Sequence, residues 1–461
     1  MNKKTAPQKK EKDKMILKKE IRDDKEGETE KKGKKARQTF QSVKGIYEIL
    51  PEEWVWREKF EAMVKGVAHF YDFKRIETGI IENADLFTRS VGEGTDIVKK
   101  EMFFLKSGGS HGDKWVLRPE GTASVARAYL QYGFSSLPQP VKLFYLGPMF
   151  RHENPQAGRY RQLTTAGFEI IGGENDAVYD AEVLQIAFRI MREAGLKDAV
   201  AEINSIGCRV CRPNLKKKLV NYYSSKTRKI CRDCQERLKQ NPFRLLDCKN
   251  EMCQEIKKDA PVFLDGLCSV CKHHFKNFLE YLDELKIPYE VNNNLVRGLD
   301  YYSRTVFEIF VPSSEQAKLA VAGGGRYDYL IETIGGRPTA GVGFGIGIER
   351  LVSIIREKAL KPPAKPKNRI FFIHVGDVAK KRSLTVIEEL RENGIAVRES
   401  LGKDSLQKQM KLADVEGVEW VLMFGQKEVY EESVIIKNMK TGIQETILLR
   451  KVTDELKRRM K

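Results

Sequence analysis

Residues 295–307, LVRGLDYYSRTVF, combine an arginine, an aspartate and two tyrosines with an apolar run. Arg297, Asp300, Tyr301 and Tyr302 lie within six residues, and we expect a strand to begin near Leu295. Buried polar groups cost free energy unless they are paired. Such a density at the start of a strand is therefore costly in an ordinary core and indicates a role other than packing. Within this segment, Asp300 is expected to orient Arg297 or a tyrosine rather than to touch a ligand.

Three further segments have the residue types of a site for an anion and an amine. FRHENPQAGRYRQ (150–162) places arginines between two predicted strands, where they suit bidentate binding of phosphate. RPEGTAS (118–124) places a carboxylate and a hydroxyl on a turn into a helix, where they could receive an amine. In GFGIGIERL (343–351) alternating glycines let a flat ligand approach the backbone, and Arg350 opens a helix. No dinucleotide-binding or P-loop glycine pattern is present.

All eight cysteines lie within 208–271. The first four follow C-x2-C-x19-C-x2-C, which is the spacing of a tetrahedral zinc site, and the second four follow C-x4-C-x14-C-x2-C. Structural Zn²⁺ is predicted, with inert free thiols as the alternative, and spacing leaves sequential and interleaved pairing both open. His273 and His274 are interpreted as solvated helix residues rather than ligands. The predicted metal ligands are Cys208, Cys211, Cys231, Cys234, Cys248, Cys253, Cys268 and Cys271.

The elements that must position these groups follow from periodicity. Residues 52–73 have helical spacing, KLFYLGPMFRHE and LTTAGFEIIG are two facing strands, and a helix is expected to stop at Gly195. Beyond a Pro- and Lys-rich linker, strands alternate with helices as in a small α/β domain. The predicted division is a disordered basic tail (1–40), the first part of the main domain (41–207), a Cys-rich insertion (208–290), the second part of the main domain (291–358), a linker (359–368) and a C-terminal domain (369–461).

Charge and length restrict the class of protein. The 461 residues carry a formal net charge of +18, of which residues 1–37 contribute +7, so the remaining chain is itself basic. A basic folded part indicates an anionic partner such as RNA, although a solvated basic surface is the alternative. With neither a signal peptide nor a long apolar run, we expect a cytoplasmic protein without membrane attachment.

Taken in order, these motifs resemble the class II aminoacyl-tRNA synthetases, and within them the histidyl-tRNA synthetase family. FRHE and GIGIER resemble the second and third motifs of the class, whereas LVRGLDYY and GGGRYD resemble the histidine-specific signatures, supported by LRPEGTA and GQKEV. The resemblance covers about residues 40–461. It implies an α+β fold: a catalytic domain of antiparallel sheet with helices, the Cys-rich insertion, and a C-terminal α/β anticodon-binding domain.

The resemblance also implies an activity and a set of site residues. Histidine would react with ATP and Mg²⁺ to give histidyl-adenylate and pyrophosphate, and would then be transferred to the 3′ end of tRNA(His) by a homodimer. The implied catalytic arginines are Arg151, Arg297 and Arg350. The implied ATP-binding residues are Arg151, Glu153 and Arg350. The implied histidine-binding residues are Glu120, Gly121, Thr122, Arg151, Thr165, Glu169, Arg297, Tyr301 and Tyr302, with Glu120 and Thr122 on the α-ammonium and Glu169 and Tyr302 on the imidazole.

Two other functions compete with this prediction. A noncatalytic paralogue, such as the regulatory subunit of ATP phosphoribosyltransferase, would share the fold but typically lacks the anticodon-binding domain and the motif arginines. A zinc-stapled RNA-binding protein would explain the charge and the cysteines but not the histidine signatures. The presence of Arg151, Arg297, Arg350 and the domain 369–461 favours the ligase.

Overall fold

The structure, a computed structural model, describes residues 40–106, 114–154, 159–312, 320–358, 370–402 and 405–460. The predicted disordered tail and linker lie outside these residues, apart from residue 40. Residues 40–48 are the described part of a unit separate from the rest of the chain, and they contain neither helix nor strand. No helix among the described residues is long and apolar enough to cross a membrane.

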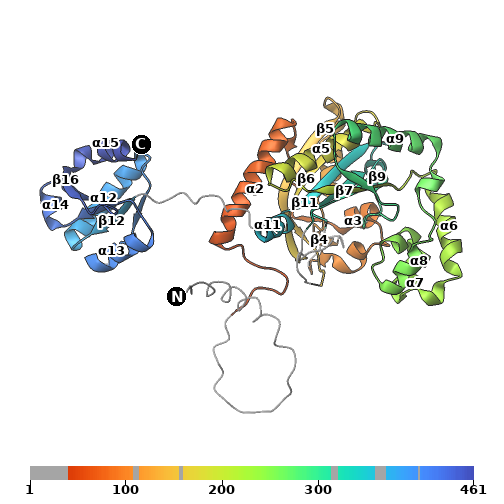
Figure 1. Ribbon diagram of the computed structural model, residues 1–461, viewed down its shortest axis with the longest axis horizontal. Coiled ribbons are helices and arrows are strands. Elements are labelled where there is room, and N and C mark those ends of the chain that lie inside the picture. Colours follow the sequence, from red (N-terminus) through yellow and green to blue (C-terminus); the bar gives the residue numbers. More distant parts are fainter. Residues whose placement is uncertain are drawn as a thin grey trace, which may run out of the picture. The chain divides into compact units, whose positions relative to one another are not determined.

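The catalytic domain is built on an eight-stranded sheet (Figure 1). In spatial order its strands are β1 (Lys74–Arg75), β5 (Val141–Phe150), β6 (Gln162–Ile171), β11 (Gly341–Gly347), β10 (Ala322–Arg326), β9 (Ser303–Phe310), β7 (Val200–Ser205) and β8 (Tyr289–Val291). The pairs from β5 to β7 are antiparallel, and only β1 and β8 pair in parallel at the two edges. The predicted antiparallel class and the facing pair β5–β6 are confirmed.

Both faces of β5 and β6 are buried, and the face that carries Glu169, called the polar face below, also contains apolar side chains such as Leu143 and Ile171. Phe144 pairs with Phe168, and both join the core formed with α2 (Pro51–Phe70), α5 (Val178–Glu193) and α11 (Ile348–Glu357). The Phe168 and Phe344 rings stack with centroids 5.1 Å apart. Because successive side chains point to opposite faces, Tyr145 and Glu169 project away from this core. The polar face therefore carries the predicted site.

A second core lies on the polar side of the sheet. It includes residues of α3 (Ala84–Val91), α4 (Thr122–Gln131) and the small antiparallel sheet β2 (Ile81–Asn83), β4 (Trp115–Leu117) and β3 (Phe103–Phe104). The π-helix η1 (Ile97–Glu101) follows α3. The short helix α10 (Leu330–Thr333) also contributes. Polar groups of the site therefore lie between two apolar layers.

The Cys-rich insertion is mostly helical. Figure 1 shows α6, α7 and α8 gathered at one end of the catalytic domain. Its helices are α6 (Arg212–Ser224), α7 (Arg232–Gln240), α8 (Glu251–Lys257) and α9 (Ser269–Glu284), with the 3-10 segments η3 (Thr227–Lys229), η4 (Pro242–Asp247) and η5 (Leu264–Gly266).

The strand expected from Leu295 begins instead at Ser303. Residues 295–302 form a loop whose backbone bonds lead away from the sheet: the Asp300 amide donates to the Val91 carbonyl over 3.0 Å. A guanidinium N–H of Arg212 donates to the Tyr302 carbonyl over 3.0 Å. These partners, distant in sequence, replace the ladder that a strand would need.

The C-terminal domain has the predicted α/β organisation. Its sheet runs β13 (Val397–Glu399), β12 (Ile370–His374), β14 (Trp420–Phe424), β15 (Ser433–Asn438) and β16 (Gln444–Leu448), with the first three strands parallel. Its helices are α12 (Asp377–Glu392), α13 (Leu406–Val415), α14 (Gln426–Tyr430) and α15 (Leu449–Arg459). Helix α14, strand β16 and helix α15 were not predicted.

Candidate active site

One cavity of about 390 Å³ brings the predicted motifs together, a size typical of small-ligand sites. Ten of the predicted substrate residues line it: Glu120, Gly121, Thr122, Arg151, Glu153, Thr165, Arg297, Tyr301, Tyr302 and Arg350. The exception is Glu169, which is fully buried and does not line the cavity. Segments more than 200 residues apart in sequence thus meet at one concave site.

Glu120 is held at the start of α4. Its carboxylate accepts hydrogen bonds from the backbone N–H groups of Thr122 (2.7 Å) and Ala123 (2.8 Å). Burial raises the pKa of Glu120, and these two donors oppose the rise. The Tyr301 hydroxyl lies 3.4 Å from the same carboxylate. A fixed carboxylate at the cavity wall can receive a cationic amine.

Glu169 lies behind this wall and organises it. Its carboxylate accepts from the Thr122 hydroxyl (2.7 Å) and from the Tyr327 hydroxyl (2.6 Å). Burial raises the pKa of Glu169 to about 8, although both hydroxyl donors lower it. Its carboxylate oxygens have lone pairs for a further donor. Thr122 connects Glu169 to the cavity, because its hydroxyl can accept from a ligand while donating to the carboxylate.

The glycines of β11 have two different tasks. Gly343 pairs with Glu169 across the sheet, and a Cβ at Gly343 would collide with the Glu169 carboxylate. Gly345 and Gly347 line the cavity, as expected for strand backbone that a flat ligand approaches. The interpretation of every glycine here as ligand space was therefore wrong for Gly343, which makes room for a buried acid.

Arg297 extends across β10 and pairs with Glu308. Burial lowers the pKa of Arg297, but Glu308 together with Tyr302 and Tyr301 outweighs burial and raises this pKa above its usual value. A Cβ at Gly323 would meet the guanidinium, so this glycine permits its position. The Arg297 guanidinium also lies 5.7 Å from the Tyr302 ring centroid. Arg297 is thus a fixed, permanently charged group in the cavity wall.

Two other arginines form a second cationic region. The Nε of Arg151 donates to the Pro119 carbonyl over 2.9 Å, and Arg350 donates to the Ala320 carbonyl over 2.9 Å. Glu153 lies 3.8 Å from Arg151 and 3.7 Å from Arg159. Burial, followed by the charges of Arg151 and Arg159, lowers the pKa of Arg350. Clustered arginines in a concave site suit a polyphosphate.

Asp300 was expected to orient Arg297 or a tyrosine, and this expectation is wrong. It accepts a hydrogen bond from the Asn241 side chain over 2.6 Å, and it faces the charges of Arg212 and Arg244. All three partners belong to the Cys-rich insertion. Sequence spacing could not reveal this contact, because the partners are 56 to 88 positions away.

The cysteines form two groups, and their pairing is nested. Cys208, Cys211, Cys268 and Cys271 form one group, and Cys231, Cys234, Cys248 and Cys253 form the other. Neither the sequential nor the interleaved pairing is correct, and the C-x2-C-x19-C-x2-C run does not form a single site. Helix α9 brings Cys268 and Cys271 next to Cys208 and Cys211. The first and last cysteine pairs therefore form one group, and the two middle pairs form the other.

The sulfur positions fit the predicted metal. A tetrahedral zinc ion with Zn–S bonds of about 2.3 Å separates its sulfurs by about 3.8 Å. The Sγ atoms of Cys208 and Cys211 are 3.7 Å apart, and those of Cys231 and Cys248 are 3.8 Å apart. Backbone N–H groups of Cys268 and Cys231 point at the sulfurs of Cys211 (3.1 Å) and Cys253 (3.2 Å). Such donors favour thiolates.

His274 is buried, so its interpretation as a solvated residue was wrong. Its Nε2 lies 3.6 Å from Asp180, whose carboxylate accepts from Arg326 Nε over 2.9 Å. Burial lowers the pKa of His274. The arginine of GGGRYD therefore joins a buried structural cluster, while the adjacent Tyr327 reaches the site.

Comparisons with known proteins agree with this arrangement. The pattern described as histidyl-tRNA synthetase matches residues 45–351. This chain belongs to the histidyl-tRNA synthetase family. The pattern described as anticodon binding domain matches residues 369–459. The activity of a histidyl-tRNA synthetase is the ATP-dependent attachment of histidine to tRNA, and this chain is such an enzyme.

Individual relatives extend the likeness over most of the chain. The histidine–tRNA ligase of Dehalococcoides mccartyi strain 195 is 43% identical over 421 residues, which cover 91% of this chain and 100% of that protein. That of Aquifex aeolicus is 42% identical over 411 residues, covering 89% and 99%. The crystal structure of apo histidyl-tRNA synthetase from S. aureus superposes with a TM-score of 0.75 at 33% identity, covering 91% of this chain and 100% of that one.

Several residues of this cavity and its support were missed from sequence. Tyr145 lines the cavity between Gly121 and Gly167, where a Cβ on either glycine would collide with its ring. Glu308, the partner of Arg297, also lines it. Tyr327 reaches Glu169 from a motif already singled out, so the tyrosine of GGGRYD was the one signal that could have been followed.

The pKa of Glu169 predicts a pH dependence of stability. The folded-state pKa of about 8 exceeds the unfolded value of about 4.3, so the protonated form of Glu169 stabilises the folded state. This stabilisation is complete below about pH 4, and it is lost as pH rises toward 8. Relative to Glu169→Gln, which has no such proton, the unmodified catalytic domain should lose on the order of a few kcal/mol of unfolding free energy between pH 5 and 8. Denaturant titrations of both proteins at pH 5, 6.5 and 8 measure this. A constant difference between them would contradict the raised pKa.

Proposed function

We propose that the cavity between β6, β9, β10 and β11 is where this histidine–tRNA ligase activates histidine with ATP. The observation that carries the proposal is the meeting of Glu120, Arg151, Arg297 and Arg350 at one cavity. The carboxylate suits the α-ammonium group, and the arginines suit the carboxylate and phosphates of the two substrates. Histidyl-adenylate and pyrophosphate are the products of this first step, and transfer of histidine to the 3′ end of tRNA(His) is the second.

Recognition of histidine is assigned to the Glu120–Glu169 side of the cavity. The α-ammonium group would donate to Glu120 and to the Thr122 hydroxyl. The imidazole would lie between Tyr302 and Glu169, whose spare lone pairs accept a ring N–H. Tyr301, Gly121 and Thr165 would complete the wall. A site built to pair both ring nitrogens leaves buried polar groups unsatisfied with another amino acid, so it rejects that amino acid strongly.

Chemistry on the α-phosphate is assigned to the arginines. Arg297 would bind the histidine carboxylate and the α-phosphate together, which aligns oxygen and phosphorus for in-line attack. Arg151 and Arg350 would balance the charge that develops on the phosphates, and Glu153 would accept from the adenine amino group. Mg²⁺ would be held chiefly by the phosphates and water, because the described residues offer only cysteines in groups of three or more possible ligands. When bound, it neutralises phosphate charge.

We propose one structural Zn²⁺ in each cysteine group. The thiolates would close the coordination sphere, so the metal would hold the insertion together rather than react. Metal analysis of the purified full chain should give about two zinc ions per chain. The double variant Cys208→Ser/Cys268→Ser should lose one ion, since both residues belong to one group, whereas Cys208→Ser/Cys248→Ser should lose both.

These two variants separate the possible pairings. Sequential or interleaved pairing would place Cys208 and Cys268 in different sites, so loss of both ions from the first variant would contradict the nested arrangement. A chain that binds no zinc at all would leave the cysteines as buried free thiols.

Assembly and partners are proposed on separate observations. Ile81 and Trp115 are exposed on the same face of the sheet β2–β4–β3, because Asn83 pairs with Trp115 and Ile81 with Leu117. An apolar face of this kind suits a second copy of the chain, and sedimentation equilibrium would test the homodimer.

The domain 369–459 would bind the anticodon of tRNA(His), and a cytoplasmic location is proposed with it.

Aminoacylation tests the complete function. The purified chain should attach labelled histidine to tRNA(His) in the presence of ATP and Mg²⁺, and should leave non-cognate tRNAs uncharged. A noncatalytic histidine-binding paralogue would bind histidine and give no charged tRNA, which would contradict the proposal.

A further inference from the structure

The loop 295–302 lacks the support that regular structure would give it. It precedes β9, and it carries Arg297, Tyr301 and Tyr302, which the proposed function assigns to histidine. Residues in irregular segments keep a fixed position only through their individual contacts. Where those contacts originate therefore determines what controls the geometry of the histidine site.

Two of the loop's contacts come from the Cys-rich insertion. The side-chain amide of Asn241 donates to Asp300 over 2.6 Å, and Arg212 donates to the Tyr302 carbonyl over 3.0 Å. The guanidinium of Arg244 faces Gly298, where an added Cβ would lie 3.1 Å from its NH1 atom. The insertion thus touches the loop at its middle and at its end.

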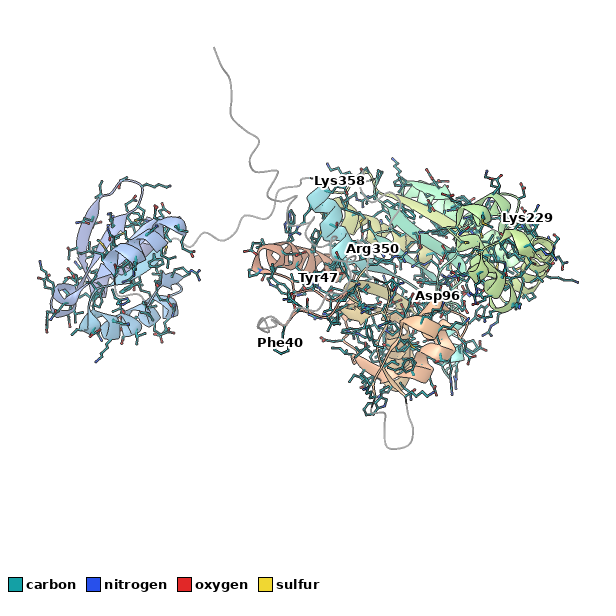
Figure 2. All side chains as sticks on the ribbon, turned by 90° about the horizontal axis from the view of Figure 1, so that it is seen from below. Phe40, Tyr47, Asp96, Lys229, Arg350 and Lys358 are labelled. Carbon is teal, nitrogen blue, oxygen red and sulfur yellow. The ribbon has the colours of Figure 1, made fainter. Side chains whose placement is uncertain are left out.

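The insertion also contacts a second wall of the cavity. Arg244 donates to Asp96 over 3.1 Å, and Arg237 donates to the same carboxylate over 3.4 Å. Asp96 precedes the π-helix η1, and it lines the active-site cavity together with Ile97 and Arg244. Figure 2 labels Asp96 within the catalytic domain, at the side of the insertion. One segment of the insertion therefore contacts two walls of the same cavity.

This segment lies between residues of a single cysteine group. Asn241 and Arg244 lie at the end of α7 and in η4, between Cys234 and Cys248. Both cysteines belong to the inner group, and both are buried. The arrangement holds the two ends of the segment together, so that its polar side chains are presented to the loop in one orientation.

We propose that Asn241 and Arg212 are positioning residues for histidine activation, and that the insertion sets the geometry of the loop 295–302 before any tRNA is bound. This rests on the proposed assignment of Arg297 and Tyr302 to histidine. Asp300 receives the contact from Asn241, which accounts for an acidic residue beside the two tyrosines. The insertion then acts in the first half-reaction, in which tRNA takes no part.

Histidine-dependent ATP–pyrophosphate exchange without tRNA tests the proposal. Asn241→Ala should lower kcat/KM for histidine about tenfold, while the KM for ATP stays within about twofold, since a contacting pair couples by about one power of ten. The double variant Asn241→Ala/Asp300→Ala should be no worse than Asp300→Ala alone. Calorimetric titration of histidine should show the same weakening for Asn241→Ala, independently of turnover.

Two further variants keep the outcome clear. Arg212→Lys retains the charge but loses the planar donor to Tyr302, and it should also lower kcat/KM for histidine with an unchanged thermal midpoint. Arg228→Ala, at an exposed position of the same insertion, should match the unmodified chain. Normal histidine kinetics in folded Asn241→Ala and Arg212→Lys would overturn the proposal. Absence of exchange in the unmodified chain would instead overturn the proposed function.

Discussion

Arg297→Ala is expected to lower kcat/KM of histidine-dependent ATP–pyrophosphate exchange by about 1,000-fold, the loss typical of removing one fixed donor to a developing charge. The reason is that Arg297 would neutralise the histidine carboxylate and the α-phosphate together. The guanidinium is already held in place by Glu308 and by the space at Gly323. Arg297→Lys should not restore the rate, because an ammonium group cannot form the two parallel hydrogen bonds.

A folded but inactive protein is the expected state of this variant. Loss of the arginine leaves Glu308 without this partner, but Glu308 keeps a quarter of its side-chain surface exposed, and water can solvate it. Arg192→Ala, an exposed arginine at the end of α5, serves as the control and should keep full activity. Near-normal exchange by Arg297→Ala would remove this residue from the mechanism.

Glu169→Gln is expected to raise the KM for histidine at least about 100-fold, because the imidazole N–H would stabilise the ionised form of Glu169, whereas an amide has no ionised form and only one acceptor oxygen. The amide keeps the size of the carboxylate, so Gly343 still accommodates it. One of its two polar ends is a donor, which conflicts with the Thr122 and Tyr327 hydroxyls that now donate to Glu169. Steady-state exchange kinetics with varied histidine measure the change.

The matched control is Glu174→Gln, an exposed glutamate just beyond β6, which should leave both substrates unaffected. Tyr327→Phe should give an intermediate rise in the KM for histidine, since it removes one of the donors to Glu169. A Glu169→Gln protein with an unchanged KM would mean that Glu169 is only a structural acid behind the wall.

Much of the site could be predicted from local sequence. FRHE, LRPEGTA, LVRGLDYY and GIGIER each carry their polar residues in short windows, and the cavity gathers ten of the expected substrate residues. The runs KLFYLGPMFRHE and LTTAGFEIIG likewise predicted β5 and β6, because two such runs on either side of a polar loop are typical of paired strands. Local motifs were sufficient to predict the site where the reactive side chains and the residues that hold them lie in the same short segment.

The failures all involve long-range contacts. The nested cysteine groups depend on α9 returning to Cys208, which no spacing rule contains. Asp300 was assigned to its neighbours in sequence, whereas it binds Asn241 across 59 positions. Gly343 was attributed to a ligand, but its partner is the buried Glu169 on the adjacent strand. Each case required knowledge of which elements become neighbours after folding.

The most direct test of the central claim is ATP–pyrophosphate exchange by the purified full chain, with each of the twenty amino acids and no tRNA. The cavity described here predicts exchange with histidine and none above background with the other nineteen, since only histidine pairs Glu120, Tyr302 and Glu169 together. No exchange with any amino acid from folded protein, or equal exchange with several, would contradict the account.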